Sequence, residues 1–228
     1  MDRGLADQLS RQLGIAPEHL AREEYELLIL RGLLEQELGS VLVFKGGTAL
    51  RLAYGSPRFS DDLDFSTTAP IAGKAFARAA GDAARPFPQI TLVEALPKRF
   101  TLFALYRVRD PSLPSAFSIR VEASTRRERW EQGRDFDLRL LTSPVTPVSV
   151  LARVATLERL WADKEAALAN RRQPRDLYDL WFIAQKLRRE FAPDLRGLDR
   201  RVIRRELRKY LPRPHWQVIE QWSERNPG

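Results

Sequence analysis

The stretch from 41 to 65 constrains the fold of this chain more than any other part of its sequence. A short apolar run at 41–44 leads into Lys-Gly-Gly-Thr, and residues 49–54 then read as a helix that a Gly-Ser-Pro sequence ends. In the next segment, residues 59–65, apolar side chains alternate with acidic ones, which is typical of a half-buried strand. The predicted order is strand, tight turn, helix, strand.

The acidic strand predicts a metal site. Successive side chains of a strand point to opposite faces, so Asp62 and Asp64 share one face while Leu63 and Phe65 enter the core. Two neighbouring carboxylates repel each other unless a cation neutralises them, and Mg²⁺ favours a few carboxylates together with water and phosphate oxygens. An exposed acidic edge or a turn cap remains the alternative explanation.

The diglycine turn predicts a phosphate site. Gly46 and Gly47 open a helix, so backbone N–H groups can approach an anion closely, and Thr48 adds a hydroxyl near the positive end of that helix. The alternative is a plain tight turn that requires a positive φ.

The remaining pattern predicts an α+β fold. A mixed sheet with helices against it should form an N-terminal core at 1–148, and a helical, basic domain should follow at 149–228. We expect the Pro- and Ser-containing segment 141–149 to break regular structure, with only helices after about 150. The other expected elements are helices at 18–38 and 71–85 and strands near 90–96, 100–108 and 117–124.

Composition excludes several classes of site. The chain has 228 residues, no cysteine and two isolated histidines, which excludes disulfides, thiolate metal sites and a histidine-based zinc site. Any metal must therefore be held by oxygen. The apolar runs are too short to span a bilayer, and the N-terminus lacks the apolar core of a signal peptide. We expect a cytoplasmic protein without a membrane partner.

The excess positive charge lies entirely in the second half. Residues 1–114 carry 14 basic and 14 acidic side chains, whereas residues 115–228 carry 24 and 16. A basic lobe suits a polyanionic partner such as RNA, because neutralising phosphates releases counterions. A solvated, arginine-rich helical surface would give the same count.

The turn and the acidic strand together resemble the polymerase-β nucleotidyltransferase signature, although the gap between them is longer than in most of that superfamily. The sequences KGGTALRLAY at 45–54 and RFSDDLDF at 58–65 are similar to AbiEii-type toxins, which include the MenT enzymes. Two further motifs of that family follow, LWADKEAAL around Lys164 and RRQPRDLYD at 171–179. The resemblance covers roughly 40–185 and implies a toxin of a toxin–antitoxin pair that transfers nucleotides from an NTP, in characterised relatives to the tRNA 3′ end.

The downstream motifs agree with a physical interpretation of the residues. In a helix expected at about 150–170, Val154, Leu157 and Trp161 form an apolar stripe, and Lys164 continues it. An inward lysine requires an anion, for which a triphosphate is a good candidate, whereas the alternative is a side chain that extends along the stripe to solvent.

A second helix should begin at Pro174. It places Asp176 and Asp179 on one face of its first turn, where capping of the helix dipole alone would also explain them. The resemblance makes Asp176 part of the active site, and Arg175 is a candidate phosphate ligand.

A third metal carboxylate is expected because two-metal chemistry shares three acids between the cations. Glu122 alternates correctly within the strand 118–122, and Glu94 on an earlier strand is its rival. The predicted site therefore has Asp62, Asp64 and Glu122 at Mg²⁺ or Mn²⁺, with Gly46, Gly47, Thr48, Lys164 and Arg175 at the nucleotide. Asp62, Asp64, Lys164 and Asp176 are the predicted catalytic residues.

The predicted reaction is in-line transfer of a nucleotide from an NTP to an acceptor hydroxyl. The expected partners are the NTP, an RNA acceptor, for which tRNA is the leading candidate, and a cognate antitoxin. Two other functions stay open: a small-molecule nucleotidyltransferase of the aminoglycoside-modifying sort, and a module that binds an NTP or an antitoxin without catalysis.

Overall fold

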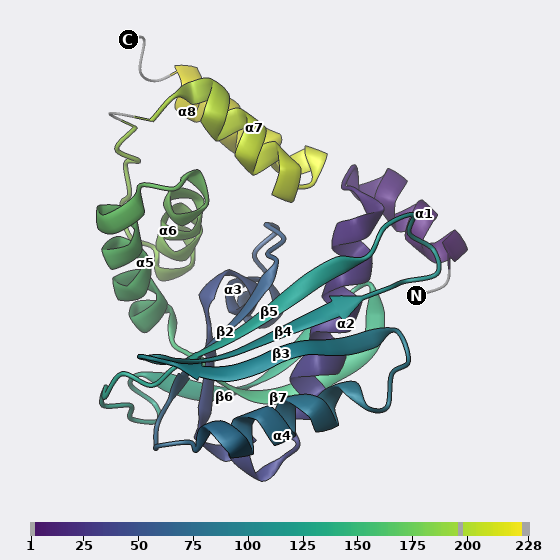
Figure 1. Ribbon diagram of the computed structural model, residues 1–228. Helices are drawn as coiled ribbons and strands as arrows, with labels where there is room; N and C mark the ends of the chain where they lie inside the picture. The colour runs from purple at the N-terminus through teal and green to yellow at the C-terminus, as the bar shows by residue number, and fades with distance from the viewer. Residues whose placement is uncertain (1–2, 196–197, 225–228) are drawn as a thin grey trace.

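The computed structural model describes residues 3–195 and 198–224 (Figure 1). This part of the chain contains eight α-helices, two short 3₁₀ helices and one seven-stranded sheet. The strands are β1 (Leu42–Lys45), β2 (Asp62–Thr67), β3 (Ile90–Lys98), β4 (Thr101–Val108), β5 (Phe117–Ser124), β6 (Phe136–Ser143) and β7 (Thr146–Ala155). The helices are α1 (Arg3–Leu13), α2 (Pro17–Leu34), α3 (Gly46–Tyr54), α4 (Gly73–Ala84), α5 (Leu157–Arg171), α6 (Pro174–Leu187), α7 (Arg200–Tyr210) and α8 (Trp216–Glu224).

The sheet is mixed, as the sequence predicts. Its strand order is β3-β4-β5-β2-β1-β7-β6. β1 pairs antiparallel with β2 and parallel with β7, and β2 pairs parallel with β5. The predicted strand, turn, helix and strand are present as β1, the diglycine turn, α3 and β2, so the acidic strand lies near the middle of the sheet.

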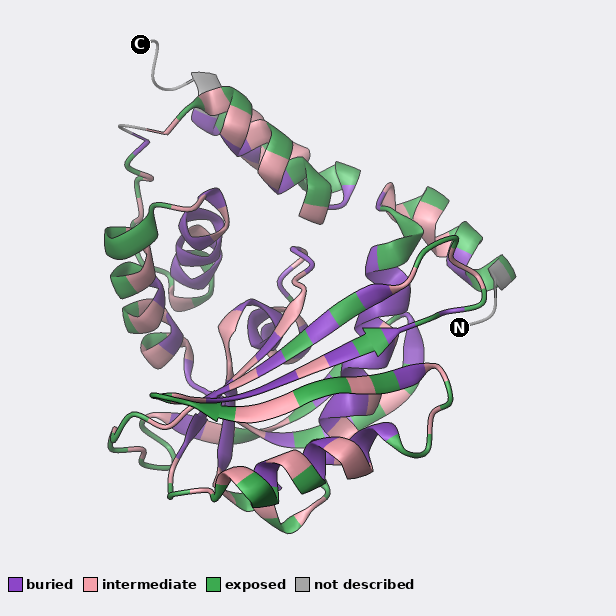
Figure 2. Cartoon of the chain, in the orientation of Figure 1, coloured by how far each residue is buried: buried purple, intermediate pink, exposed green. Residues whose placement is uncertain are grey.

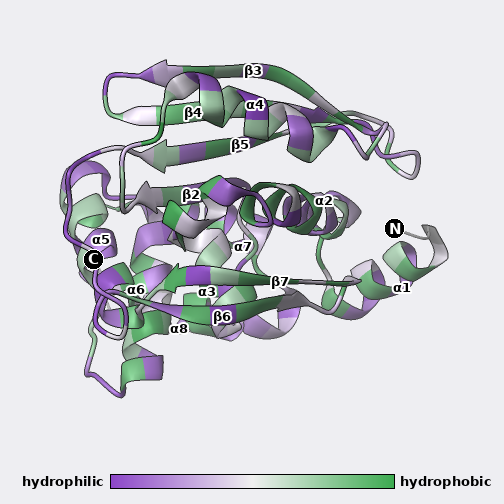
Figure 3. Ribbon diagram, turned by 90° about the horizontal axis from the view of Figure 1, so that it is seen from below, coloured by the Kyte–Doolittle hydropathy of each residue, from purple (hydrophilic) through white to green (hydrophobic). Residues whose placement is uncertain are grey.

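The core lies between the sheet and the helices α2 and α4, which pack against each other (Figure 2). Figure 3, seen from below, shows α4 lying along β3 and β4. Leu63 and Phe65 of β2 are buried on this side, with the ring centroid of Phe65 5.2 Å from that of Phe44. The burial of these two side chains leaves Asp62 and Asp64 on the opposite face, as the alternation predicts.

Two expectations about the middle of the chain are wrong. Residues 141–149 do not interrupt the sheet, because β6 and β7 form an antiparallel hairpin whose turn falls between Ser143 and Thr146. Val154 is therefore not on a helix stripe but in β7, where it pairs with Phe44 of β1. The predicted domain boundary at 148/149 falls inside β7. The C-terminal part of the chain, which contains only helices, begins at Leu157.

Beyond the sheet, α5 and α6 pack against each other, and α7 packs against α6 and α8 (Figure 1). Thr156 caps α5 by accepting a hydrogen bond from the N–H of Arg159, which fixes where sheet gives way to helix. Among the described residues, no helix is both long and apolar enough to cross a membrane.

Candidate active site

Three carboxylates share one face of the sheet. Asp64 is half-buried on β2 and lies in register with Glu122 of the parallel strand β5. Asp62 lies two residues earlier on the same face, with its side chain 22% exposed. The rival third acid, Glu94, is exposed on β3, and two strands separate it from β2. The register therefore brings Glu122, and not Glu94, to the aspartate pair.

The diglycine turn packs directly on this acidic strand. Gly46 has a φ of +82°, and a Cβ there would lie 2.4 Å from Oδ2 of Asp64. A Cβ on Gly47 would lie 2.4 Å from Nη2 of Arg58 and 2.7 Å from Oγ of Ser60. Only glycine allows this approach. No described side chain caps α3, so the first N–H groups of the helix remain available to an anion beside Asp64.

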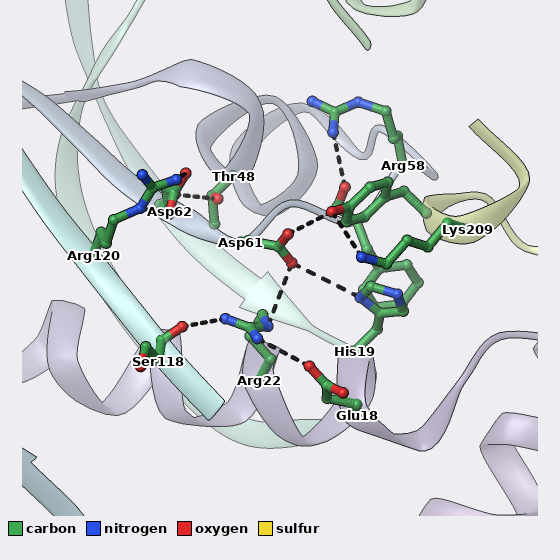
Figure 4. Close-up of polar contacts among 12 residues, drawn as sticks. Glu18, His19, Arg22, Thr48, Arg58, Asp61, Asp62, Ser118, Arg120 and Lys209 are labelled. Atoms are coloured by element: carbon green, nitrogen blue, oxygen red, sulfur yellow. Dashed lines mark hydrogen bonds and ion pairs between the residues drawn. The ribbon is translucent and has the colours of Figure 1, made fainter. Parts of the chain in front are cut away.

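Thr48 has a different role from the one predicted for its hydroxyl. The side chain is buried, and Oγ1 donates a 2.6 Å hydrogen bond to the backbone carbonyl of Asp62 (Figure 4). The hydroxyl therefore joins α3 to the start of β2 and is not directed to a phosphate. Only the backbone N–H of Thr48 could contribute to an anion site.

Asp62 is held by a residue that sequence reasoning missed. Nε and Nη2 of Arg120 lie 2.8 and 2.6 Å from the two carboxylate oxygens of Asp62 (Figure 4). Arg120 is half-exposed on β5, in register with Asp62. The alternation of the strand 118–122, which places Arg120 on the face of Glu122, is the signal that could have identified it.

Asp64 is electrostatically strained. Burial raises its pKa to about 6, and the negative charges of Asp62 and Glu122 act in the same direction, against the opposing effects of Lys164 and Lys45. Lys45 lies in register with Asp64, and its Nζ is 3.1 Å from Oδ2 of Asp163 on α5. A carboxylate in such surroundings gains from a divalent cation, because the cation removes the repulsion between the acids.

The donor set suits Mg²⁺ or Mn²⁺ in kind, since all three candidate ligands are carboxylates. In the described part of the chain, however, no three acidic, histidine or cysteine side chains are arranged closely enough to hold a metal ion. Asp62 is turned to Arg120, so a metal would require this carboxylate to leave its guanidinium partner.

Lys164 faces inward, as the helix stripe predicts, and is only 8% exposed. Its Nζ lies 3.0 Å from Oδ1 of Asp176 and 2.7 Å from Oδ2 of Asp179. Both aspartates are fully buried, which helix capping does not explain. The lysine therefore does not extend to solvent, and α5 and α6 are joined by this ion-pair network beneath the acidic face.

Two arginines complete the network. Arg171 donates to both oxygens of Asp176 at 2.7 and 2.8 Å, and Arg58 donates to both oxygens of Asp179 at 2.8 Å. Burial acts to raise the pKa values of both aspartates, but their hydrogen bonds and ion pairs with these cations outweigh it and hold the pKa values below the usual range. Three cations and two anions leave the network with one net positive charge.

Arg175 follows Pro174 in the first turn of α6 and is half-buried. Its Nε is buried and makes no hydrogen bond with any residue that the structure describes. A buried donor of this kind is costly unless a ligand or water satisfies it. Its assignment to a phosphate stays a prediction.

The arrangement combines the parts that nucleotidyl transfer requires. An acidic face, an open helix N-terminus and an inward lysine next to Asp64 come from the distant segments β2, α3 and α5. Once Asp62 has left Arg120, these parts can bring a cation and the phosphates of a nucleotide side by side.

Comparison with known proteins agrees with this geometry. The family described as "Nucleotidyl transferase AbiEii toxin, Type IV TA system" matches residues 28–224. No curated protein sequence matches the chain.

Three solved structures share the fold. MenT4, a nucleotidyltransferase toxin from Mycobacterium tuberculosis H37Rv, is 21% identical with a TM-score of 0.60 over 90% of this chain and 68% of its own. JHP933 from Helicobacter pylori is 24% identical with a TM-score of 0.55 over 75% of this chain and 68% of its own. A putative nucleotidyltransferase from H. pylori is 23% identical with a TM-score of 0.55 over 75% and 70% of the two chains.

Proposed function

The chain belongs to the AbiEii family of nucleotidyltransferase toxins of type IV toxin–antitoxin systems, and we propose that it transfers a nucleoside monophosphate from an NTP to the 3′ end of a tRNA. The reaction would require Mg²⁺ or Mn²⁺. The observation that carries the proposal is the strand register around Asp64. On one side Asp64 pairs with Glu122 of β5, and on the other it pairs with Lys45 of β1, the residue before the diglycine turn. This register places the acids directly beside the open N-terminus of α3.

Asp62, Asp64 and Glu122 would hold the metal. When bound, the metal neutralises the acids and phosphates and stabilises charge on the reacting oxygens. The raised pKa of Asp64 supports this assignment, because such a carboxylate is stabilised by a nearby cation.

The other residues of the site would bind and orient the nucleotide. N–H groups at Gly46 and Gly47 would receive the triphosphate at the N-terminus of α3. Lys164 would offset phosphate charge from the side of α5, with Asp176 and Asp179 holding its ammonium in place. Arg175 would supply a further donor from α6. The acceptor oxygen attacks the α-phosphorus as the bond to pyrophosphate breaks, and the hydroxyl proton passes to solvent water.

The acceptor proposal depends on the C-terminal helices. Residues 183–228 hold 12 basic and 6 acidic residues. α7 exposes Arg201, Arg205, Arg208 and Lys209 to solvent. A helix with these cations suits the phosphate backbone of RNA and is not needed for a small-molecule acceptor. A cytoplasmic location, where tRNA and NTPs are found, and a cognate antitoxin from the same system are part of the proposal.

Incubation of the purified protein with each labelled NTP, Mg²⁺ and total tRNA tests the function, with Asp64→Asn as the inactive control. We expect label on RNA from the wild-type protein and none from the variant. Label on an aminoglycoside without any on RNA would indicate a small-molecule transferase. NTP binding without transfer to either acceptor would indicate a non-catalytic module.

A further inference from the structure

A second lysine lies on the acidic face, on the opposite side of Asp64 from Glu122. Lys45 ends β1, and the antiparallel register of β1 with β2 places it directly opposite Asp64. Residues paired in this way point to the same face, with Cβ atoms about 5 Å apart. The strand β5, which carries Glu122, pairs with the other edge of β2. The order across this face is therefore Glu122, Asp64, Lys45.

Lys45 is also the residue at which the diglycine turn begins. It is the N-cap residue of α3, and Gly46, which follows it, lies so close to Asp64 that a Cβ would meet the carboxylate. Burial raises the pKa of Asp64, and Lys45 is one of the two lysines whose charge acts against this rise. The turn, Lys45 and Asp64 are therefore immediate neighbours.

The ammonium of Lys45 has donors available for a ligand. Its Nζ lies 3.1 Å from Oδ2 of Asp163 on α5, and this is the one ion pair or hydrogen bond that it makes with a described residue. An ammonium has three donors, so two remain. The Lys45 side chain is 21% exposed, whereas that of Lys164 is 10% exposed. A ligand that enters from solvent can therefore reach Lys45.

Asp163 can release Lys45 without becoming an isolated charge. Its other oxygen, Oδ1, lies 3.6 Å from Nε of Arg159, and this Nε makes no hydrogen bond with a described residue. The arginine is thus a second partner that is already in place. The ion pair of Lys45 with Asp163 is partly exposed, and pairs of this kind contribute little to stability. A phosphate that binds Lys45 has only a weak ion pair to displace.

From this geometry we infer that Lys45 binds the β- and γ-phosphates of the NTP and stabilises the departing pyrophosphate, an inference that rests on the proposed function. The acceptor oxygen forms its bond to the α-phosphorus, and the bond from the α-phosphorus to the oxygen of the β-phosphate breaks. The electron pair of that bond leaves with pyrophosphate. Lys45 keeps its proton and donates hydrogen bonds to the oxygens that gain charge, which stabilises the transition state electrostatically.

The assignment to the leaving group follows from the order of the residues across the sheet. In-line displacement places the attacking oxygen and the pyrophosphate on opposite sides of the α-phosphorus. The open N-terminus of α3, the candidate anion site, lies on the Lys45 side of Asp64, whereas Glu122 lies on the other side. A triphosphate with its α-phosphorus at Asp64 and its tail at the turn therefore has Lys45 beside its β- and γ-phosphates.

Binding of inorganic tripolyphosphate in the presence of Mg²⁺, measured by calorimetry, tests this contact without turnover. Lys45→Met keeps a long side chain and removes the charge. We expect the Kd to rise about tenfold, as for the loss of one charge-assisted hydrogen bond, and Lys45→Arg to restore most of the binding. The matched control is Lys74→Met, at an exposed position of α4, which should bind as the wild-type protein does.

Turnover tests the role of Lys45 in the departure of pyrophosphate. Lys45→Met should lower kcat about a hundredfold and leave KM for RNA unchanged. NTP analogues with CH₂ or CF₂ in place of the β,γ-bridging oxygen differ in the basicity of the leaving group. The CF₂ analogue should exceed the CH₂ analogue in rate by a larger factor in Lys45→Met than in the wild-type protein, because no ammonium offsets the charge. A purely structural lysine would leave this rate ratio unchanged.

Asp163→Asn separates the phosphate contact from the ion pair. It removes the same ion pair but keeps the ammonium of Lys45, so it should not weaken tripolyphosphate binding. Equal losses in Asp163→Asn and Lys45→Met would overturn the inference, as would unchanged tripolyphosphate binding or an unchanged rate ratio in Lys45→Met. These outcomes leave the proposed function intact. Absence of RNA labelling by the wild-type protein would overturn the proposed function, and with it the role of Lys45 at the leaving group.

Discussion

Arg120 and Asp62 face each other across β5 and β2, and the guanidinium holds both carboxylate oxygens at 2.8 and 2.6 Å. The pair is half-exposed, so its arginine can leave without a large cost. In this state Arg120 supplies the positive charge that a metal would supply to Asp62. Cation binding at the acidic face therefore competes with an ion pair built into the sheet.

Replacement of Arg120 by Ala should tighten metal binding. In the wild-type protein, Asp62 must give up its ion pair with Arg120 before it can bind a metal. An exposed ion pair contributes up to about 1 kcal/mol, and the variant does not have to lose this energy. We expect the Kd for Mn²⁺, measured by titration calorimetry without NTP, to fall about threefold to fivefold. Arg107→Ala on β4, also exposed, is the control and should leave the Kd unchanged. Weaker metal binding by Arg120→Ala would show that the arginine supports the metal site.

Metal binding should weaken as the pH falls through about 6. Asp64 must be ionised to hold a cation, and its pKa is raised to about 6. The affinity for Mn²⁺ should be nearly constant above pH 7 and should drop about tenfold for each pH unit well below 6. A plateau that extends to pH 5 would show that Asp64 is ionised at that pH without a cation.

Asp64→Asn should stabilise the metal-free protein at neutral pH. Since the folded-state pKa is above the ordinary value of 3.8, protonation favours folding below pH 4, and this contribution is lost as the pH rises through about 6. The substitution removes the buried charge, so we expect a gain of about 1–2 kcal/mol at pH 7.5 and little gain at pH 4. Thermal unfolding at both pH values measures this, and Mg²⁺ should raise the Tm of the wild-type protein only.

Arg58→Ala should destabilise the fold strongly. Asp179 is fully buried and would lose its bidentate partner, leaving Lys164 as its remaining cation. Removal of one member of a buried ion pair costs about 3–5 kcal/mol, which lowers the Tm of a chain of this size by about 10 °C. Arg78→Ala, which removes an exposed pair with Asp82, should change the Tm by less than about 2 °C. Equal effects of the two substitutions would contradict the importance of the network.

Charge reversal on α7 should weaken RNA binding and leave NTP binding unchanged. Arg201 and Arg205 are exposed, so Glu at both positions should increase KM for RNA at least about tenfold and flatten its dependence on salt. The control is Lys74→Glu with Arg78→Glu on α4, which changes the net charge equally on a distant surface. Undiminished labelling of RNA by the α7 variant would exclude this helix as the tRNA surface.

Local alternation was sufficient to predict the strand, turn, helix and acidic strand at the centre of the site. It also predicted the inward direction of Lys164, because burial follows the helix period. The hairpin of β6 and β7 was missed because Pro144 and Pro147 suggested a break, whereas the structure accommodates Pro147 near the start of β7. The alternation of residues 136–141 and the β-branched residues at 148–154 carried the opposite signal.

Contacts between distant segments were beyond sequence reasoning. Arg58 reaches Asp179 across 121 positions, a contact that no local pattern predicts. Alternation places Arg120 on the face of Glu122, but it does not reveal that Asp62, 58 positions earlier, lies opposite. The hydroxyl of Thr48 was assigned to a phosphate because helix N-termini favour anions, but in the folded chain the carbonyl of Asp62 is within its reach. The register between strands, which decides these contacts, is set by the tertiary fold.

The strand β1 lies between β2 and β7, and β7 comes about one hundred residues later in the chain. A ribosome therefore releases the diglycine turn and the acidic strand long before their neighbour, and longer still before Lys164 and Asp179. A nascent chain halted before α6 already has the acids together with Lys45, Arg120 and Lys164, but it lacks Asp176 and Asp179, which hold the ammonium of Lys164 in place. The last charges to join the site are therefore those that position Lys164.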